Sequence, residues 1–310
     1  MDFLLLLKSK KTFIELIILL ILYLLLNRLI FLLLILLLVF FIYKSNKKSS
    51  IPIPKELENL KMKALMENLN KSSNSIKDNF TFEDKINIPH IKDDSYILVK
   101  VYSASLNHID SIFLFSQIPF VRWFRLWHYG VGSDFSGKIV QIGKNVKKYK
   151  VGDDIFGFTI YGALQEYALT YESRVFKKPS LISYNEACCL QTCFGTAYKS
   201  LTYYFRENVK DKNVLIVGAS GGVSIFAIQI AKYLGFKTIY GVCSSKNKEL
   251  VQNFGIDEVL CYDKENYIND CSVTFDLIFD NAYSPELLQY ENIKYFLNLI
   301  LEKMLLLMVL

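Results

Sequence analysis

The sequence has no CxxC pair among its six cysteines, which are Cys188, Cys189, Cys193, Cys243, Cys261 and Cys271. Several of these cysteines lie inside apolar stretches of the chain. The spacing of the cysteines and the apolar residues around them together predict buried, reduced thiols in a protein that faces the cytosol.

The sequence also lacks a basic stripe. Its net charge is +6, but the lysines are spread through polar stretches, and 52% of the residues are hydrophobic. Proteins that bind nucleic acid usually gather their positive charge on one face or along one helix. Nucleic-acid binding is therefore not expected.

A small-residue cleavage site is missing after the long apolar stretch near the N-terminus, which argues against a cleaved signal peptide. Residues 13–43 are apolar except for Glu15 and the pair Asn27–Arg28. A transmembrane helix needs about 20 apolar residues. We therefore expect a membrane anchor within residues 1–45, with the span near 24–43; a shallow hairpin that turns at Asn27–Arg28 is the alternative. Lysines at both ends leave the orientation open.

The rest of the chain divides into a polar stretch and two patterns of secondary structure. Residues 46–61 contain two prolines and predict a linker. In residues 62–185, short β-rich runs are cut by glycines, which is typical of a small, tightly turned barrel. In residues 186–310, strand and helix patterns alternate, which predicts βαβ units on a parallel sheet. A helical pattern over 185–205 joins the two parts.

A glycine-rich turn separates an apolar strand pattern from an apolar helical pattern within residues 213–232. Such a turn leaves backbone amides free to bind phosphate, and its glycines let a dinucleotide approach. Only Gly221 fits the pattern GxGxxG, because Ser224 stands at the third glycine position. That glycine mainly serves helix–strand packing, so a serine is expected to cost little. The predicted cradle consists of Gly218, Ser220, Gly221, Gly222, Val223 and Ser224; an ordinary turn with an unused cradle is the alternative.

The end of the next strand pattern bears on the choice of cofactor. A site for NAD has an acid there, which holds the ribose 2′-hydroxyl. This sequence instead has Ser244, Ser245, Lys246 and Lys248, with no acid before Glu249. Hydroxyl and ammonium groups suit a 2′-phosphate, so NADPH is expected as the cofactor. The alternative for the two lysines is a solvated start of the following helix.

Seven sequence segments occur in the order of one known family. They are MKAL, ILVKVYSASLNHID, GVGSDFSGKIVQIGKNVKKYKVGDDIFGF, YGALQEYALT, ISYNEACCLQTCFGTAYKSL, VLIVGASGGVSIFAIQIAK and FDLIFDN. Over residues 62–282 the chain therefore resembles the medium-chain dehydrogenases and reductases, in their zinc-free quinone oxidoreductase and enoyl reductase branch. The resemblance implies an α/β fold, with a GroES-like β-barrel domain at 62–185 followed by a Rossmann parallel sheet at 186–310.

The resemblance also implies roles for individual residues. Asn107 and Asp110 would lie at the catalytic cleft. Thr196 would contact the cofactor, and Lys248 and Tyr262 would hold its 2′-phosphate. The substrate and the nicotinamide would meet between the two domains.

Three positions depart from related sequences. Asn107 and Ser133 stand where the zinc-dependent branch has a cysteine and a histidine, so no metal is expected. His108 stands where the family usually has proline or tyrosine. With Asn107 and Asp110 it completes the predicted catalytic set, as a general acid that titrates near neutrality. A histidine that is merely hydrogen-bonded beside an Asp is the alternative.

An aromatic segment at residues 113–130 also contains Arg122 and Arg125. Trp and Arg together suit a lipid headgroup interface. The segment predicts a lip that dips into a membrane and takes up lipophilic substrates; an apolar wall of the cleft is the alternative.

The two ends of the chain bear on its function. The apolar N-terminal segment resembles that of a membrane-anchored fungal subgroup, whose members are linked to sorting or stabilising a plasma-membrane proton pump. At the other end, the family normally continues beyond the last residue here, and its usual glycine pair after FDN is replaced by AYSPE. The Rossmann domain is therefore expected to be truncated and its sheet incomplete.

We therefore expect a membrane-anchored, zinc-independent reductase that transfers a hydride from NADPH to a lipophilic quinone, enone or enal. Its globular part is expected in the cytosol, and the membrane that holds the anchor stays open. The alternative is an inactive scaffold with the same fold that binds or stabilises a membrane-protein partner.

Overall fold

The computed structural model describes residues 51–52, 54–67, 80–115, 130–160, 162–204, 208–264, 273–282, 284 and 293–298. The helices and strands named below belong to the larger of two compact units, which comprises Ile53–His90 and Ser95–Leu310. The predicted membrane anchor and most of the aromatic segment at 113–130 lie outside the described residues. Within the described ranges, no helix is both long and apolar enough to span a bilayer.

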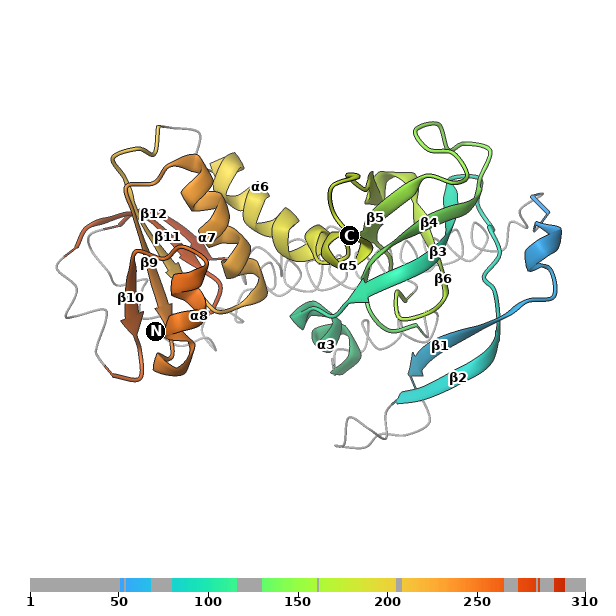
Figure 1. The fold of residues 1–310 in the computed structure, drawn as a ribbon, viewed down its shortest axis with the longest axis horizontal. Helices are drawn as coiled ribbons and strands as arrows, with labels where there is room; N and C mark the ends of the chain where they lie inside the picture. The colour runs from blue at the N-terminus through green and yellow to red at the C-terminus, as the bar shows by residue number, and fades with distance from the viewer. Residues whose placement is uncertain are drawn as a thin grey trace, which may run out of the picture. The chain divides into compact units, whose positions relative to one another are not determined.

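One five-stranded antiparallel sheet has the strand order β6-β3-β4-β5-β7 (Figure 1). Its strands are β3 (Tyr96–Ser105), β4 (Asp134–Ile142), β5 (Asp154–Phe158), β6 (Tyr167–Tyr171) and β7 (Val175–Lys177). A separate antiparallel pair joins β1 (Lys61–Glu67) to β2 (Phe80–Asn87). The short 3-10 helices η1 (Lys55–Leu57) and η3 (Glu172–Arg174) and the helix α3 (His108–Phe115) complete this part. The β-rich part of the predicted fold is thereby confirmed.

The core of the antiparallel sheet is built around β3 and β4. Ile97 and Val99 are fully buried, and they cluster with Phe135, Ile139 and Ile155 of the neighbouring strands. Side chains of this size each stabilise a fold by about 1.5–3 kcal/mol when they are fully buried.

A close backbone contact holds β4 against β3. A Cβ atom on Gly137 would lie 2.1 Å from the carbonyl oxygen of Lys100. Any side chain at this position would therefore push the two strands apart, so the sheet needs glycine here.

The second five-stranded sheet is parallel throughout and has the order β10-β9-β8-β11-β12 (Figure 1). Its strands are β8 (Asn213–Val217), β9 (Thr238–Cys243), β10 (Glu258–Cys261), β11 (Phe275–Asp280) and β12 (Ile293–Asn298). The order reverses between β8 and β11, as it does in a Rossmann sheet. The predicted parallel sheet is confirmed, and β12 adds a strand that the sequence pattern did not indicate.

Three helices accompany the parallel sheet: α6 (Gly195–Tyr204), α7 (Gly222–Leu234) and α8 (Lys248–Asn253). Val214 and Ile216 of β8 pack into one core cluster with residues of these helices. Leu215 and Val217 pack into a second cluster with β9 and β11. β8 is therefore buried on both faces, which is usual for a central parallel strand.

A three-part helical segment precedes the parallel sheet. α5 (Tyr184–Ala187) begins with a capping box between Ser183 and Glu186. The π-helical turn η4 (Leu190–Phe194) follows, and α6 continues from it. The sequence predicts a helical pattern over 185–205, and the structure interrupts it with η4. Such π-helical turns frequently mark functional sites.

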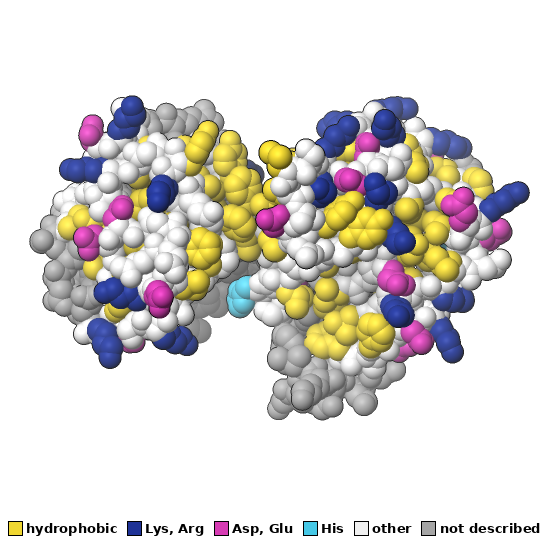
Figure 2. Space-filling view, viewed as in Figure 1, with side chains coloured by type: hydrophobic (Ala, Val, Ile, Leu, Met, Phe, Trp, Pro, Cys, Tyr) yellow, Lys and Arg dark blue, Asp and Glu magenta, His cyan; other side chains and the backbone are white. Residues whose placement is uncertain are grey.

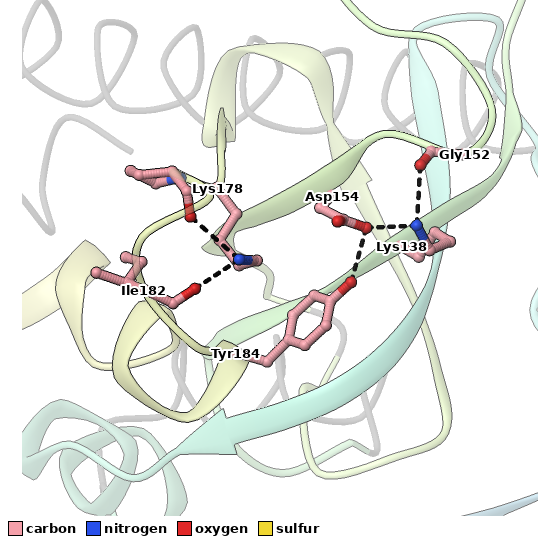
Figure 3. Close-up of polar contacts among 7 residues, drawn as sticks. Lys138, Gly152, Asp154, Lys178, Ile182 and Tyr184 are labelled. Carbon is pink, nitrogen blue, oxygen red and sulfur yellow. Dashed lines mark hydrogen bonds and ion pairs between the residues drawn. The ribbon is translucent and has the colours of Figure 1, made fainter.

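Tyr184 ties the start of this segment to the antiparallel sheet (Figure 3). Its hydroxyl donates to Asp154 Oδ1 at 2.7 Å, and Lys138 Nζ pairs with the same oxygen at 2.5 Å. Lys178 Nζ lies 5.1 Å from the centroid of the Tyr184 ring and donates to the carbonyl of Ile182 at 2.6 Å. These contacts hold the chain that leads into η4.

Charged side chains are mixed on the face that Figure 2 shows. Lys and Arg side chains are scattered over the described part of this face, with Asp and Glu side chains among them. Hydrophobic side chains fill areas between them. On the viewed face, positive charge is therefore not gathered into a stripe.

Candidate functional site

Asp110 and Asn107 form the first part of the candidate site, at the start of α3. Asp110 is 5% exposed, and its Oδ2 accepts the backbone N–H of Asn107 at 2.7 Å. Its Oδ1 accepts the hydroxyl of Ser133. Burial raises the pKa of the Asp110 carboxyl, and the bonds from Ser133 and Asn107 oppose that rise. The carboxyl group therefore fixes the loop that presents the Asn107 side chain.

Asp134, the first residue of β4, is held by the π-helical turn η4. Its Oδ2 accepts the backbone N–H of Thr192 at 2.9 Å, and its Oδ1 accepts the Thr192 hydroxyl at 2.7 Å. Asp134 is fully buried, and burial raises its pKa to about 6 despite these two bonds. The nearby charge of Asp110 raises the pKa further. The antiparallel sheet and η4 are thus joined through one buried carboxyl group.

The Asn107 side chain lies between these carboxyl groups and Cys193. Its Oδ1 accepts the thiol of Cys193 at 3.2 Å. Its Nδ2 is buried and has no partner at hydrogen-bonding geometry, although the amide is close enough to Asp134 to lower the pKa of that carboxyl. A buried donor without a partner is costly, so this amide is suited to a ligand oxygen.

His108 is placed differently from the other two candidate catalytic residues. Its side chain is exposed at the first position of α3, whereas Asp110 is buried and bonded to Asn107 and Ser133. The imidazole is therefore free to meet solvent or a substrate. Its role as a general acid stays a prediction.

The sequence predicts no metal site, because Asn107 and Ser133 stand at positions where the zinc-dependent branch has zinc ligands. In this structure both side chains form other contacts. Ser133 donates to Asp110, and Asn107 contacts Cys193. No group of three or more His, Cys, Asp or Glu side chains that could hold a metal ion occurs in the part of the chain that the structure describes.

The predicted phosphate cradle follows β8 as a tight turn. Gly218 has φ +69°, a backbone conformation that favours glycine, and a Cβ there would meet the Cβ of Ala282 at 3.1 Å. Gly221 is the N-cap of α7 in an extended conformation, and Gly222 opens the helix. A Cβ on Gly222 would lie 3.1 Å from Cys193 Sγ. A Cβ on Gly218 or Gly222 would thus crowd a neighbouring residue, so the turn needs glycine there. A glycine turn that opens a helix is also the backbone that a pyrophosphate can approach, so these residues fit a dinucleotide.

The remaining cradle residues tie the turn to its surroundings. Ser220 Oγ accepts Nδ2 of Asn247 at 3.1 Å. Val223 and Ser224 are buried in the first turn of α7, and Ser224 Oγ accepts Nδ2 of Asn281 at 3.3 Å. A hydrogen bond therefore accommodates Ser224 in this packed position. Thr196, the other residue expected to contact the cofactor, is half-buried in the first turn of α6.

The residues expected at the cofactor's 2′-position follow β9 and β10. Ser244 is buried, whereas Lys248 and Tyr262 are exposed. Ser245 is already engaged, because its N–H and hydroxyl both donate to the carboxylate of Asp263. Sequence reasoning missed Asp263, since it looked for an acid only after the second strand of the sheet. Asp263 could have been found by also looking for an acid after the third strand, β10. In a parallel sheet β10 ends beside β9, the second strand.

Comparison with known proteins shows which proteins this chain resembles. Residues 93–180 match the alcohol dehydrogenase GroES-like domain. The chain is 30% identical over 221 residues to 2-methylene-furan-3-one reductase of Solanum lycopersicum, covering 66% of this chain and 54% of that protein. It is 31% identical over 215 residues to the chloroplastic NADPH-dependent alkenal/one oxidoreductase of Arabidopsis thaliana, covering 64% and 52%. The structure of the quinone oxidoreductase from Coxiella burnetii superposes with a TM-score of 0.63 at 25% identity, covering 72% of this chain and 69% of that one.

These similarities support the medium-chain dehydrogenase/reductase superfamily and its quinone oxidoreductase and enoyl reductase branch, as the seven sequence segments predicted. They also confirm the combination of a GroES-like domain with a Rossmann-like parallel sheet. The chain spans about half the length of the curated relatives it matches.

Proposed function

We propose that this chain belongs to a membrane-anchored reductase that uses NADPH to reduce a lipophilic quinone, enone or enal. Its similarity to proteins named as a furanone reductase, an alkenal/one oxidoreductase and a quinone oxidoreductase supports the reaction class. The apolar stretch at 13–43 supports the anchor, with the globular part in the cytosol.

The observation that carries this proposal is the contact of one side chain with both halves of the site. Cys193 Sγ lies 3.2 Å from Asn107 Oδ1 and would lie 3.1 Å from a Cβ on Gly222. The amide with an unpartnered donor and the glycine turn are therefore neighbours. A ligand that rests on the turn and reaches toward Asn107 would engage both.

The residues of the site have distinct tasks in this proposal. A bound nicotinamide would supply the hydride. Asn107 Nδ2 would donate to the carbonyl oxygen of the substrate as negative charge develops there. Asp110 and Asp134 would keep the Asn107 amide oriented, and His108 would deliver the proton that completes the reduction. Lys248 and Tyr262 would face the 2′-phosphate of the cofactor.

The second candidate is the scaffold that binds or stabilises a membrane-protein partner. The loop after β11 favours it, because Asn281 and Ala282 lie against the glycine turn. The Cβ of Ala282 is 3.1 Å from the place of a Cβ on Gly218, and Nδ2 of Asn281 is 3.3 Å from that of a Cβ on Gly221. A loop that stayed in this place would compete with a pyrophosphate.

A reductase assay on the full chain in mild detergent separates the two candidates. We expect NADPH oxidation with at least one member of a set of quinones, enones and enals, and a large loss of kcat in Asn107→Ala. Asn213→Ala is the matched control, because Asn213 also has a buried amide atom without a partner but lies at the start of β8. A folded chain that neither binds nor oxidises NADPH would support the scaffold.

A further inference from the structure

Asp263 brings an acid to the position where the sequence pattern suggested none. The register of β9 and β10 pairs Cys243 with Cys261, so the residues that follow the two strands emerge side by side. The N–H of Ser245 donates to Asp263 Oδ1 at 2.8 Å, and the Ser245 hydroxyl donates to Oδ2 at 2.6 Å. Both oxygens of the carboxylate are thus bound by one serine.

A carboxylate and a lysine ammonium group both lie near the end of β9. The bonds from the Ser245 side chain and backbone lower the pKa of Asp263, and the charge of Lys264 adds to this, so the group is a carboxylate at neutral pH. Burial raises the pKa of the neighbouring Cys243 thiol, Asp263 raises it further, and Lys248 lowers it. An ammonium group and a carboxylate therefore both act on the end of β9.

The loop after β9 is also tied to the glycine turn. Asn247 Nδ2 donates to Ser220 Oγ at 3.1 Å, and the N–H of Ala219 donates to the carbonyl of Val242 at 2.8 Å. In parallel sheets of this order, a dinucleotide places its adenosine ribose at the end of the second strand. Ser245 and Asp263 thus lie where the ribose 2′-position would be.

We propose that Asp263 sets the cofactor preference of this chain. Its carboxylate occupies the N–H and the hydroxyl of Ser245, which are the donors that a 2′-phosphate would use. A 2′-phosphate must displace this carboxylate, whereas the 2′-hydroxyl of an unphosphorylated ribose can donate to it. Asp263 therefore weakens the binding of NADPH relative to NADH and offsets the attraction of Lys248. This inference rests on the proposed function, because it assumes that the glycine turn binds a dinucleotide.

The test uses two probes that differ at the 2′-position, adenosine 2′,5′-bisphosphate and 5′-AMP, titrated by calorimetry into the full chain in mild detergent. Asp263→Asn should bind the bisphosphate about tenfold more tightly than the wild type does, because it removes a like charge next to the phosphate. Its affinity for 5′-AMP should stay equal or fall. Adding Ser245→Ala to Asp263→Asn should cancel most of the gain, since the hydroxyl is then missing.

Asp257→Asn is the matched control. Asp257 Oδ2 accepts the N–H of Ile239 at 2.7 Å, near the opposite end of β9, so this variant also loses a carboxylate that binds the backbone. Its ratio of the two affinities should equal that of the wild type. If Asp263→Asn binds both probes with the wild-type ratio, Asp263 is only a structural residue and the inference is overturned. If folded wild type and variants bind neither probe, the proposed function itself is overturned, and the inference with it.

Discussion

Two carboxyl groups in this protein are bound in the same way, one at the start of β4 and one in the turn after β10, and their pKa values shift in opposite directions. Asp134 accepts the N–H and hydroxyl of Thr192 at 2.9 and 2.7 Å. Asp263 accepts the N–H and hydroxyl of Ser245 at 2.8 and 2.6 Å. Burial raises the pKa of Asp134 to about 6, whereas the hydrogen bonds lower that of the exposed Asp263.

The difference shows that burial, and not hydrogen-bond geometry, decides how each carboxyl group behaves. Two donors stabilise the charged form in both places. At Asp134 this gain is smaller than the desolvation penalty, so the group joins two parts of the fold and titrates near pH 6. At Asp263 water remains available, so the charge is kept and can act on a ligand. The first carboxyl group is structural, and we assign the second to ligand choice.

The pH dependence of stability is the largest expected effect. The folded-state pKa of Asp134 is raised from 3.8 to about 6. The stability that this group contributes is therefore fully present below its ordinary pKa of 3.8 and is lost as pH rises through about 6. Relative to Asp134→Asn, the wild type should lose about 3 kcal/mol between pH 3 and pH 7. Urea unfolding of the full chain across this range measures the difference. Parallel pH profiles for the two proteins would contradict the assignment of a raised pKa.

The two hydroxyl donors should differ in their contributions to stability at neutral pH. Thr192→Val removes a hydrogen bond to a buried charge and should lower the free energy of unfolding by about 2–3 kcal/mol. Ser245→Ala removes the equivalent bond at an exposed site and should change it by no more than about 0.5 kcal/mol. Urea unfolding of both variants checks this. Equal losses of unfolding free energy in the two variants would show that burial does not make the Thr192 bond more stabilising than the Ser245 bond.

A double-mutant cycle tests whether the antiparallel part and the glycine turn meet at Cys193. Gly222→Ala places a Cβ 3.1 Å from Cys193 Sγ, and this crowding should weaken NADPH binding several-fold. Cys193→Ala should restore much of that loss, with a coupling energy of about 0.5–1 kcal/mol. Nicotinamide fluorescence titration of the four proteins gives the cycle. Additive effects would mean that the two positions do not meet.

Ser224→Ala should have the smallest effect on cofactor binding. Ser224 Oγ accepts Nδ2 of Asn281 at 3.3 Å, a long hydrogen bond. We expect a stability change within about 1 kcal/mol and an almost unchanged affinity for NADPH. Thermal unfolding and the same fluorescence titration measure both. A loss of NADPH binding in a stable variant would show that this serine has a direct role in the cradle.

The sequence allowed both sheets and the glycine turn to be predicted, because each depends on local patterns. The strand at β8, the turn at Gly218–Gly222 and the helix α7 follow one another without a gap. The seven ordered segments then predicted the branch, which the comparisons support. The place of Ser224 could also be judged, because the third glycine serves packing more than phosphate binding.

The remaining features depend on contacts between distant parts of the chain. Thr192 binds Asp134 across 58 positions, and Ser245 binds Asp263 across 18. No spacing rule shows that Asp263 ends beside Ser245, because that follows from the register of β9 and β10. The strand β12 and the π-helical turn η4 were missed as well, since neither has a distinctive local pattern.

The most direct test of the central claim is a titration of the full chain with NADPH and NADH, followed by nicotinamide fluorescence. The account predicts saturable binding of both cofactors to the wild type. It also predicts a shift toward NADPH in Asp263→Asn but not in Asp257→Asn. Binding of neither cofactor to a folded chain would contradict the account, because the glycine turn would then hold no dinucleotide.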